Sequence, residues 1–228
     1  MRQKVMRELT KKPSQNYSET LFKSEPSELF QLAKKYSDEV GKTAISLGAD
    51  EARMMAVLIK SHACKKFVEI GTLTGYSALW TLEGLAECGE LWTLEKDPAH
   101  GERAAKVFTE FNKTLTTKKV HLVMGDARVE LENIAKNGPF DGIFIDGNKA
   151  AYGDYLAWAE KNVRKGGIIL ADNVYLGGAV WGDSSWGNLS EKQVQVMQKF
   201  NQRLADTDKY FSTLIDTAEG LFMALKKF

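Results

Sequence analysis

The sequence has little of what secreted and membrane proteins rely on. It holds only two cysteines, Cys64 and Cys88, in 228 residues, which is too few for a disulfide framework. Because they form no CxxC pair, we expect two buried, reduced thiols in a cytoplasmic protein. The first residues contain no apolar segment typical of a signal peptide. No apolar run approaches the ~20 residues that a membrane helix needs, so we expect no membrane partner.

An excess of charge of one sign is also missing. The chain carries 31 Lys and Arg against 30 Asp and Glu, for a net charge of +1. This balance predicts no general attraction to nucleic acid. The three histidines, His62, His100 and His121, have no metal-ligand spacing, so a structural zinc site is not expected and each should be at the surface or hydrogen-bonded.

Hydrophobic periodicity predicts one α/β domain with a helical N-terminal extension. Residues 1–48 are interpreted as an arm and a helix over about 26–47, and residues 49–228 as a core that begins with a helix over 49–61. In the core, short apolar segments ending in Gly or an acid alternate with helical segments, which is typical of βαβ units and a parallel, doubly wound sheet. The expected strands are 67–70, 90–94, 120–124, 142–146 and 167–172, with helices over 76–88, 98–115, 127–136, 152–163 and 191–206. Segments 210–215 and 221–226 should pair as a hairpin.

Acidic residues end almost every expected strand of this sheet. They are Glu69, Glu95, Asp126, Asp146 and Asp172. In a doubly wound sheet, ligands bind beyond the carboxyl ends of the strands, near the point where the strand order reverses. Acids gathered at this edge favour a site for cationic groups, a metal ion or hydroxyls.

The first strand leads into the turn EIGTLTGYS, residues 69–77. Gly71 and Gly75 would let the backbone approach a ligand closely, but the G-x-G-x-x-G fingerprint of dinucleotide binding is absent. Glu69 would repel a pyrophosphate and suit an ammonium group, and Glu95 could accept hydrogen bonds from ribose hydroxyls. Together, in the right strand order, they favour an adenosine ligand, and S-adenosylmethionine has the ammonium group and lacks the phosphate. Taken singly, each glycine could be an ordinary turn residue and Glu95 an exposed acid at a strand end.

A second group of polar residues ends the fourth and fifth expected strands. Asp146, Asp172 and Asn173 are hard oxygen donors that would meet if these strands are neighbours, and they suit Mg²⁺ or, as alternatives, Mn²⁺ or Ca²⁺. The alternative interpretation is a pair of helix caps. Lys149, three residues after Asp146, could act as a general base toward a metal-bound hydroxyl, or it could be a solvated loop lysine.

These motifs, taken in order, resemble the caffeoyl-CoA and catechol O-methyltransferase group of class I methyltransferases, from about residue 45 to the C-terminus. The segments that carry the resemblance are GADEARMM at 48–55, EIGTLTGYS, TLEKD at 93–97, GDA at 125–127, FDGIFIDGNKAAYGDY at 140–155 and GGIILADNVYLGG at 166–178. The resemblance implies a Rossmann-like sheet of seven strands with an antiparallel last strand. It also implies a homodimer that methylates a small aromatic hydroxyl acceptor of the catechol type.

The resemblance assigns roles position by position. It implies cofactor contacts by Leu47, Glu69, Gly71, Thr72, Ser77, Glu95, Ala127, Asp146 and Asn148, metal ligation by Asp146, Asp172 and Asn173, and catalysis by Lys149 with Asp146. The chain departs from the family at Asn148, where an acid is usual, and at Glu219 in place of an Asp. The N-terminal segment does not match the plant enzymes closely, which speaks against an acyl-CoA substrate.

The acceptor pocket is expected near the Gly-rich segment that follows residue 173. Tyr175, Trp181 or Trp186 could form its wall, with packing of the loop itself as the alternative. Three other functions stay open. They are a methyltransferase acting on nitrogen, RNA or another small molecule, a nicotinamide oxidoreductase, and a non-catalytic protein that binds S-adenosylmethionine.

Overall fold

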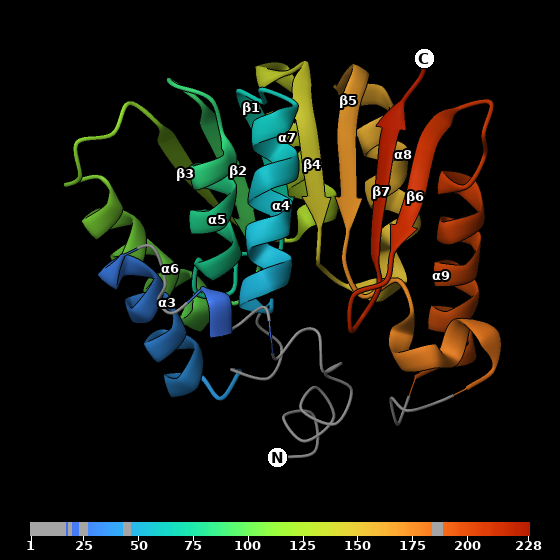
Figure 1. Ribbon diagram of the computed structural model, residues 1–228, viewed down its shortest axis with the longest axis horizontal. Coiled ribbons are helices and arrows are strands. Elements are labelled where there is room, and N and C mark those ends of the chain that lie inside the picture. The colour runs from blue at the N-terminus through green and yellow to red at the C-terminus, as the bar shows by residue number, and fades with distance from the viewer. Residues whose placement is uncertain (1–16, 18–19, 23–26, 43–46, 184–188) are drawn as a thin grey trace.

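The fold is built on a sheet of seven strands. The computed structural model describes residues 17, 20–22, 27–42, 47–183 and 189–228. The strands are β1 (Lys66–Ile70), β2 (Glu90–Glu95), β3 (Lys119–Met124), β4 (Phe140–Ile145), β5 (Val163–Ala171), β6 (Tyr210–Ile215) and β7 (Leu221–Lys226). Their order is β3-β2-β1-β4-β5-β7-β6 (Figure 1). The pairs among β1 to β5 are parallel, and β7 is antiparallel to both its neighbours, which confirms the expected fold class.

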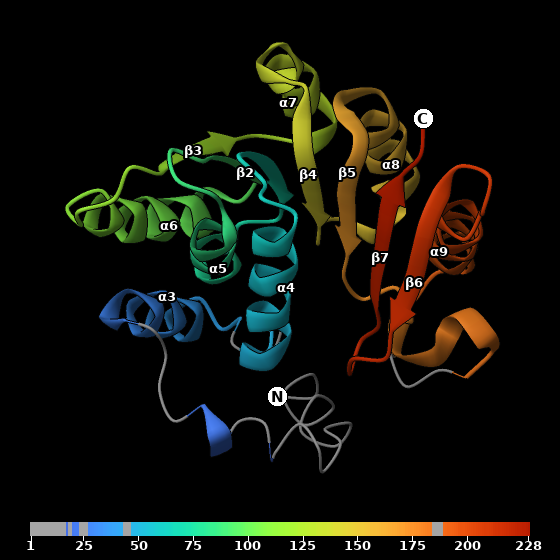
Figure 2. The ribbon, with the colours of Figure 1, turned by 45° about the horizontal axis from the view of Figure 1, so that its top comes forward.

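Helices cover both faces of this sheet (Figure 2). One side carries α3 (Glu28–Glu39), α4 (Ala49–Ser61), α5 (Tyr76–Gly84) and α6 (Pro98–Phe111), and the other carries α7 (Ala127–Ile134), α8 (Tyr152–Asn162) and α9 (Glu191–Leu204). Side chains alternate along a strand, so β1 serves both layers. Phe67 packs with the first group of helices and Val68 with the second, and both are fully buried.

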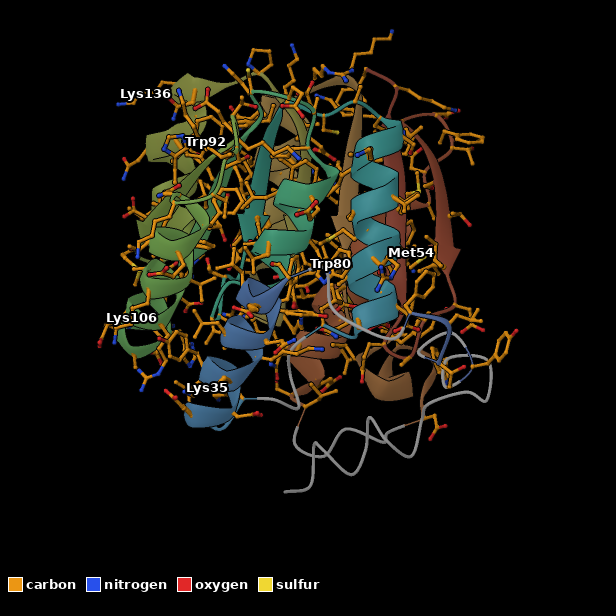
Figure 3. All side chains as sticks on the ribbon, turned by 60° about the vertical axis from the view of Figure 1, so that its left-hand side comes forward. Lys35, Met54, Trp80, Trp92, Lys106 and Lys136 are labelled. Atoms are coloured by element: carbon orange, nitrogen blue, oxygen red, sulfur yellow. The ribbon has the colours of Figure 1, made fainter. Side chains whose placement is uncertain are left out.

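The N-terminal helix α3 is anchored to this core through aromatic side chains. Trp80 of α5 lies 5.0 Å from the ring of Phe30 in α3, measured between ring centroids. The guanidinium group of Arg53, from α4, lies 4.8 Å from the centre of the same indole. Trp80 therefore links three helices at the end of the core where α3 lies (Figure 3). None of the helices in the described part of the chain is long and apolar enough to cross a membrane.

Several expected element ends are wrong, and each has a local cause. Helix α3 stops at Glu39, not near residue 47, because Gly41 adopts a φ of +68° and Lys42 N–H donates to the Ser37 carbonyl at 2.8 Å, a helix-terminating glycine motif. Helix α5 stops at Gly84, not at residue 88, since Ala86 N–H turns to donate to the Cys64 carbonyl.

Other boundaries shift for similar reasons. Helix α6 ends at Phe111, and Leu115, which we expected inside it, is fully exposed with no core to cover. Strand β5 begins at Val163 rather than at residue 167, because a bulge lets Val163 pair with Phe140 before the regular register starts. Both thiols are free, as expected, but Cys88 is exposed, in a turn with a φ of +57°.

Prediction from sheet packing. Gly142 in β4 has no room for a methyl group, because a Cβ there would lie 2.5 Å from the Phe67 ring and 2.6 Å from Ile168 Cγ2. We expect Gly142→Ala to lower the free energy of unfolding by about 1–3 kcal/mol. The matched control is Gly153→Ala in α8, where nothing lies within 4 Å and the helix should gain up to about 1 kcal/mol. Urea denaturation of both variants measures the difference, and equal stabilities would contradict the packing argument.

Candidate active site

The expected site residues meet at the point where the strand order reverses, between β1 and β4. Strand β1 lies between β2 and β4, so the turns that follow β1 and β4 are neighbours. Asp146 N–H donates to the Ile70 carbonyl at 2.9 Å, which joins the two strand ends. This is the position at which doubly wound sheets bind ligands.

Gly71 is required by this junction on two grounds. Its φ is +100°, and a Cβ at this position would lie 2.4 Å from the Asp146 carbonyl oxygen. Any side chain would push the two turns apart and strain the backbone. Gly71 is therefore more than an ordinary turn residue, because it lets the first turn lie directly against the end of β4.

Glu95, at the end of β2, holds the first turn from the other side. Its Oε2 accepts the N–H of Leu73 at 2.8 Å, and Leu73 itself has a φ of +51°. Its Oε1 accepts the N–H groups of Lys96 and Asp97 at 2.9 and 2.8 Å. The side chain is only 10% exposed, so it is not a solvated strand-end acid. A carboxylate oxygen can accept more than one hydrogen bond, so ribose hydroxyls remain compatible with this arrangement.

Glu69 is a fully buried carboxylate near the end of β1, just before the same turn. Thr93 Oγ1 donates to its Oε2 at 2.6 Å, and Thr72 Oγ1 lies 2.6 Å from Thr93 Oγ1. Burial raises the pKa of Glu69 to about 7, and hydrogen bonds from Thr93 and Ser77 counteract that rise. Ser77 thus acts on the carboxylate from outside ideal hydrogen-bond geometry, and among the described residues Oε1 has no partner that meets that geometry. A buried acceptor without a partner is costly, and a cationic donor would satisfy it.

The second part of the site centres on the ammonium group of Lys149. It donates to Asp146 Oδ1 at 2.9 Å and to Asn173 Oδ1 at 2.6 Å. It also donates to the hydroxyl of Tyr152 at 2.7 Å. The two side-chain oxygens from different strand ends thus converge on one cation, and Lys149 is not a solvated loop lysine.

Asp172 completes this group at the end of β5. Its carboxylate is buried and accepts from the backbone N–H and the side-chain amide of Asn173 at 2.7 and 3.2 Å. The Tyr152 hydroxyl donates to the Asp172 carbonyl at 2.8 Å. Burial raises the pKa of Tyr152 well above its ordinary value, and the charges of Asp146 and Asp172 raise it further. The carboxylates of Asp146 and Asp172 therefore lie near the phenol. The expected metal-binding trio of Asp146, Asp172 and Asn173 is thus gathered in one place.

The donors of this trio suit a hard cation better than a soft one. Among the described residues, no three His, Cys, Asp or Glu side chains form a metal-binding group. The available set is two carboxylates and one amide carbonyl, all oxygen donors. Asp146 and Asn173 already bind one cation, the Lys149 ammonium group, at this position. The chemistry of the set fits Mg²⁺ or a similar ion.

Comparison with known proteins now identifies the family. The sequence profile of the O-methyltransferase family matches residues 18–227. The chain belongs to the O-methyltransferase family. This membership excludes the nicotinamide oxidoreductase considered above.

Two relatives of this O-methyltransferase carry the name catechol O-methyltransferase. The protein from Niastella koreensis is 33% identical over 196 residues, covering 83% of this chain and 86% of its own. The protein from Mycobacterium tuberculosis is 32% identical over 165 residues, covering 72% of each chain.

Solved structures of O-methyltransferases share the fold. TomG from Streptomyces achromogenes, described in complex with SAM, superposes with a TM-score of 0.83 at 27% identity, covering 94% of this chain and 96% of its own. The enzyme from Bacillus cereus, described in complex with SAH, gives a TM-score of 0.81 at 26% identity, covering 94% and 97%.

The remaining expected residues of this O-methyltransferase have separate local roles. Leu47 is buried on the α4 side of the sheet, and Ala127 is the first residue of α7. Asn148 caps the short 3₁₀ helix η3 (Lys149–Ala151) by accepting from Ala150 N–H. Asp126 caps α7 and pairs with Arg128, which lowers the pKa of Asp126 to about 2. Asp126 thus acts as the N-cap of α7.

Aromatic residues follow the trio in the chain of this O-methyltransferase. Tyr175 and Trp181 pack edge to face with ring centroids 5.1 Å apart. The Trp181 side chain is 61% exposed, whereas Gly220 lies against the Tyr175 ring, where a Cβ would be 2.6 Å from Cγ. Trp181 therefore presents an exposed apolar surface on the segment that follows Asn173. Trp186 lies outside the described residues.

Sequence reasoning missed two residues that organise the site of this O-methyltransferase. Thr93 bridges Thr72 and Glu69, and Tyr152 holds Lys149. The only signals were a hydroxyl inside an apolar strand and a tyrosine three residues after Lys149. The first signal reveals its partner only when the register of β1 with β2 is known, and the second only when the segment after β4 is known to form a helical turn.

Prediction from the buried carboxylate. The pKa of Glu69 is near 7 in the folded protein and near 4.5 when unfolded. The unfolded chain therefore loses this proton first, and stability falls as the pH rises from about 4.5 to 7. We expect Glu69→Gln to remove this loss, so that between pH 5 and pH 8 the variant gains about 2–3 kcal/mol relative to the unmodified protein. Urea denaturation without cofactor tests this, and a pH-independent difference would refute it.

Proposed function

We propose that this chain transfers a methyl group from S-adenosylmethionine to one hydroxyl of a small vicinal dihydroxy aromatic acceptor, aided by a divalent cation. One observation carries the proposal. The side-chain oxygens of Asp146 and Asn173 converge on a single cation, the Lys149 ammonium, next to the turn that follows the buried Glu69 carboxylate.

The first turn supports the methyl donor. When bound, S-adenosylmethionine supplies the methyl group on a sulfonium. Glu69 Oε1 would accept from its ammonium group, Glu95 from its ribose hydroxyls, and Gly71 would allow the ligand to approach the backbone. The further contacts that we propose are with Leu47, Thr72, Ser77, Ala127, Asp146 and Asn148. Relatives of similar fold are described as complexes with SAM and with SAH.

The trio supports the cation and the acceptor. Asp146, Asp172 and Asn173 would hold Mg²⁺, with Mn²⁺ or Ca²⁺ as alternatives, and a bound cation lowers the pKa of an acceptor hydroxyl. A vicinal diol offers two oxygens to one cation, and two relatives are named catechol O-methyltransferase. Trp181 and Tyr175 would provide the apolar wall against the acceptor ring.

Lys149 is proposed as the proton acceptor. Its Nζ lies between the two donor oxygens and is held in place by the Tyr152 hydroxyl. Lys149 would act as the neutral amine: it would first release one ammonium proton to solvent and would then take the proton of the acceptor hydroxyl at Nζ, while Asp146 orients it. A homodimer and a cytoplasmic location stay predictions. A nitrogen or other small-molecule acceptor, or cofactor binding without turnover, are the alternatives.

Prediction for the cation. We expect dialysis against EDTA to abolish methylation of a simple catechol, and added Mg²⁺ to restore it. The reason is that the ion would bind both acceptor oxygens and lower the pKa of the hydroxyl that is methylated. Transfer of radiolabel from S-adenosylmethionine measures the activity. The matched variant Asp172→Asn removes one charged ligand and should raise the Mg²⁺ concentration needed for half-maximal activity at least tenfold. Full activity after EDTA treatment would exclude the cation.

Prediction for the base. Lys149→Met keeps the length of the side chain and removes its amine. Since general base catalysis typically contributes about 10²–10⁴-fold, we expect kcat to fall within that range while the affinity for S-adenosylhomocysteine changes less than threefold. Lys165→Met, in an exposed part of β5, is the control. An unchanged kcat for Lys149→Met would remove this residue from the mechanism.

A further inference from the structure

Thr93 lies one strand away from the turn that forms the proposed cofactor site. It belongs to β2 and is the register partner of Glu69 in β1. Its side chain is fully buried between Glu69 and Thr72. A threonine in this position contacts neither solvent nor a ligand space directly, so its effect must pass through its two neighbours.

The protons of the three side chains fix the direction of the hydrogen bonds. Thr93 has one hydroxyl proton, and it donates that proton to Glu69 Oε2. Thr72 must then donate its own proton to Thr93 Oγ1, 2.6 Å away. The result is a directed chain, from the Thr72 hydroxyl through Thr93 to the carboxylate, in which each hydroxyl gives one proton and Thr93 also receives one.

Neutral hydroxyls are the groups that favour the charged form of this carboxylate. The charged groups that act on Glu69 are Asp146 and Glu95, which are both acids and both raise its pKa. The groups that lower the pKa are the side chains of Thr93 and Ser77. In a buried site, losing one such donor is costly, because the carboxylate has already lost its contact with water.

We propose that Thr93 is a positioning residue for the methyl donor: it fixes Glu69 Oε2 so that Oε1 stays free for the ammonium group of the ligand. The inference rests on the proposed function, since it requires that Glu69 contacts the cofactor. Thr93 also accepts the hydroxyl proton of Thr72. Thr72 would therefore contact the ligand through its backbone and Cβ rather than by donating that proton.

A hydroxyl at position 93 is needed for this role, and its shape alone is not sufficient. Thr93→Val keeps the volume but removes the donor, which leaves Oε2 without its proton donor and Thr72 without its acceptor. Thr93→Ser keeps the hydroxyl and should rescue binding. The matched control is Thr81→Val in α5, because Thr81 is equally buried and its hydroxyl has no partner among the described residues.

The test is calorimetric titration of the full chain with S-adenosylhomocysteine, without metal or acceptor. We expect Thr93→Val to weaken binding at least tenfold, while Thr93→Ser and Thr81→Val stay within threefold of the unmodified protein. The loss should be larger at pH 6.5 than at pH 8.5, because removing the hydrogen bond raises the pKa of Glu69. Mere structural damage would weaken binding equally at both pH values.

The outcomes separate this inference from the function on which it rests. Unmodified affinity in Thr93→Val, with the unmodified protein binding normally, would overturn the role of Thr93 and leave the proposed function intact. No binding by the unmodified protein would overturn both. If Thr93→Val does not fold, Thr93→Cys offers a weaker donor of similar size. It should lose about fivefold, and affinity equal to that of the unmodified protein would overturn the inference.

Discussion

The contact between the turn after β1 and the backbone of Asp146 is the constraint on which the site depends. Asp146 N–H binds the Ile70 carbonyl, and Gly71 lies so close to the Asp146 carbonyl that no Cβ fits between them. The first turn directly follows Glu69, the proposed cofactor carboxylate, and the second begins with Asp146, the first proposed metal ligand. Their backbones touch, so the donor and the activated acceptor would be brought together by the sheet itself, and positioning of this kind supplies much of a transfer reaction's acceleration.

The electrostatics of the site follow from the same geometry. Glu69 is surrounded by hydroxyl donors and by the acids Asp146 and Glu95, whereas Asp146 has a cationic partner in Lys149. The free protein therefore holds one buried carboxylate that is costly to ionise and one that is already neutralised. A ligand with an ammonium group would relieve the first, and a divalent ion would compete with Lys149 for the second. Two such cationic partners would explain why Glu69 and Asp146 lie at one edge of the sheet.

The sequence predicted the sheet better than it predicted the connections between its elements. Apolar segments such as 67–70 must be strands because they are too short for helices and end at turn residues, and the alternation of elements implies the parallel order. The end of α3 was also readable in principle, since Gly41 is a helix-terminating glycine, but the apolar pattern that continues to Leu47 concealed it. The exposure of Cys88 could not be read, because it depends on a turn stabilised by a distant hydrogen bond from Ala86 to Cys64.

The residues that sequence reasoning missed share one physical property. Thr93 and Tyr152 are buried hydroxyls that each hold a charged side chain, Glu69 in one case and Lys149 in the other. Thr93 meets Glu69 through the register of β1 with β2, whereas Tyr152 meets Lys149 because the chain after β4 folds into a helical turn. A neutral hydroxyl fixes a charge without neutralising it. The Glu69 carboxylate is thus held in place and still available to a ligand, whereas Lys149 is held both by the Tyr152 hydroxyl and by a salt bridge to Asp146.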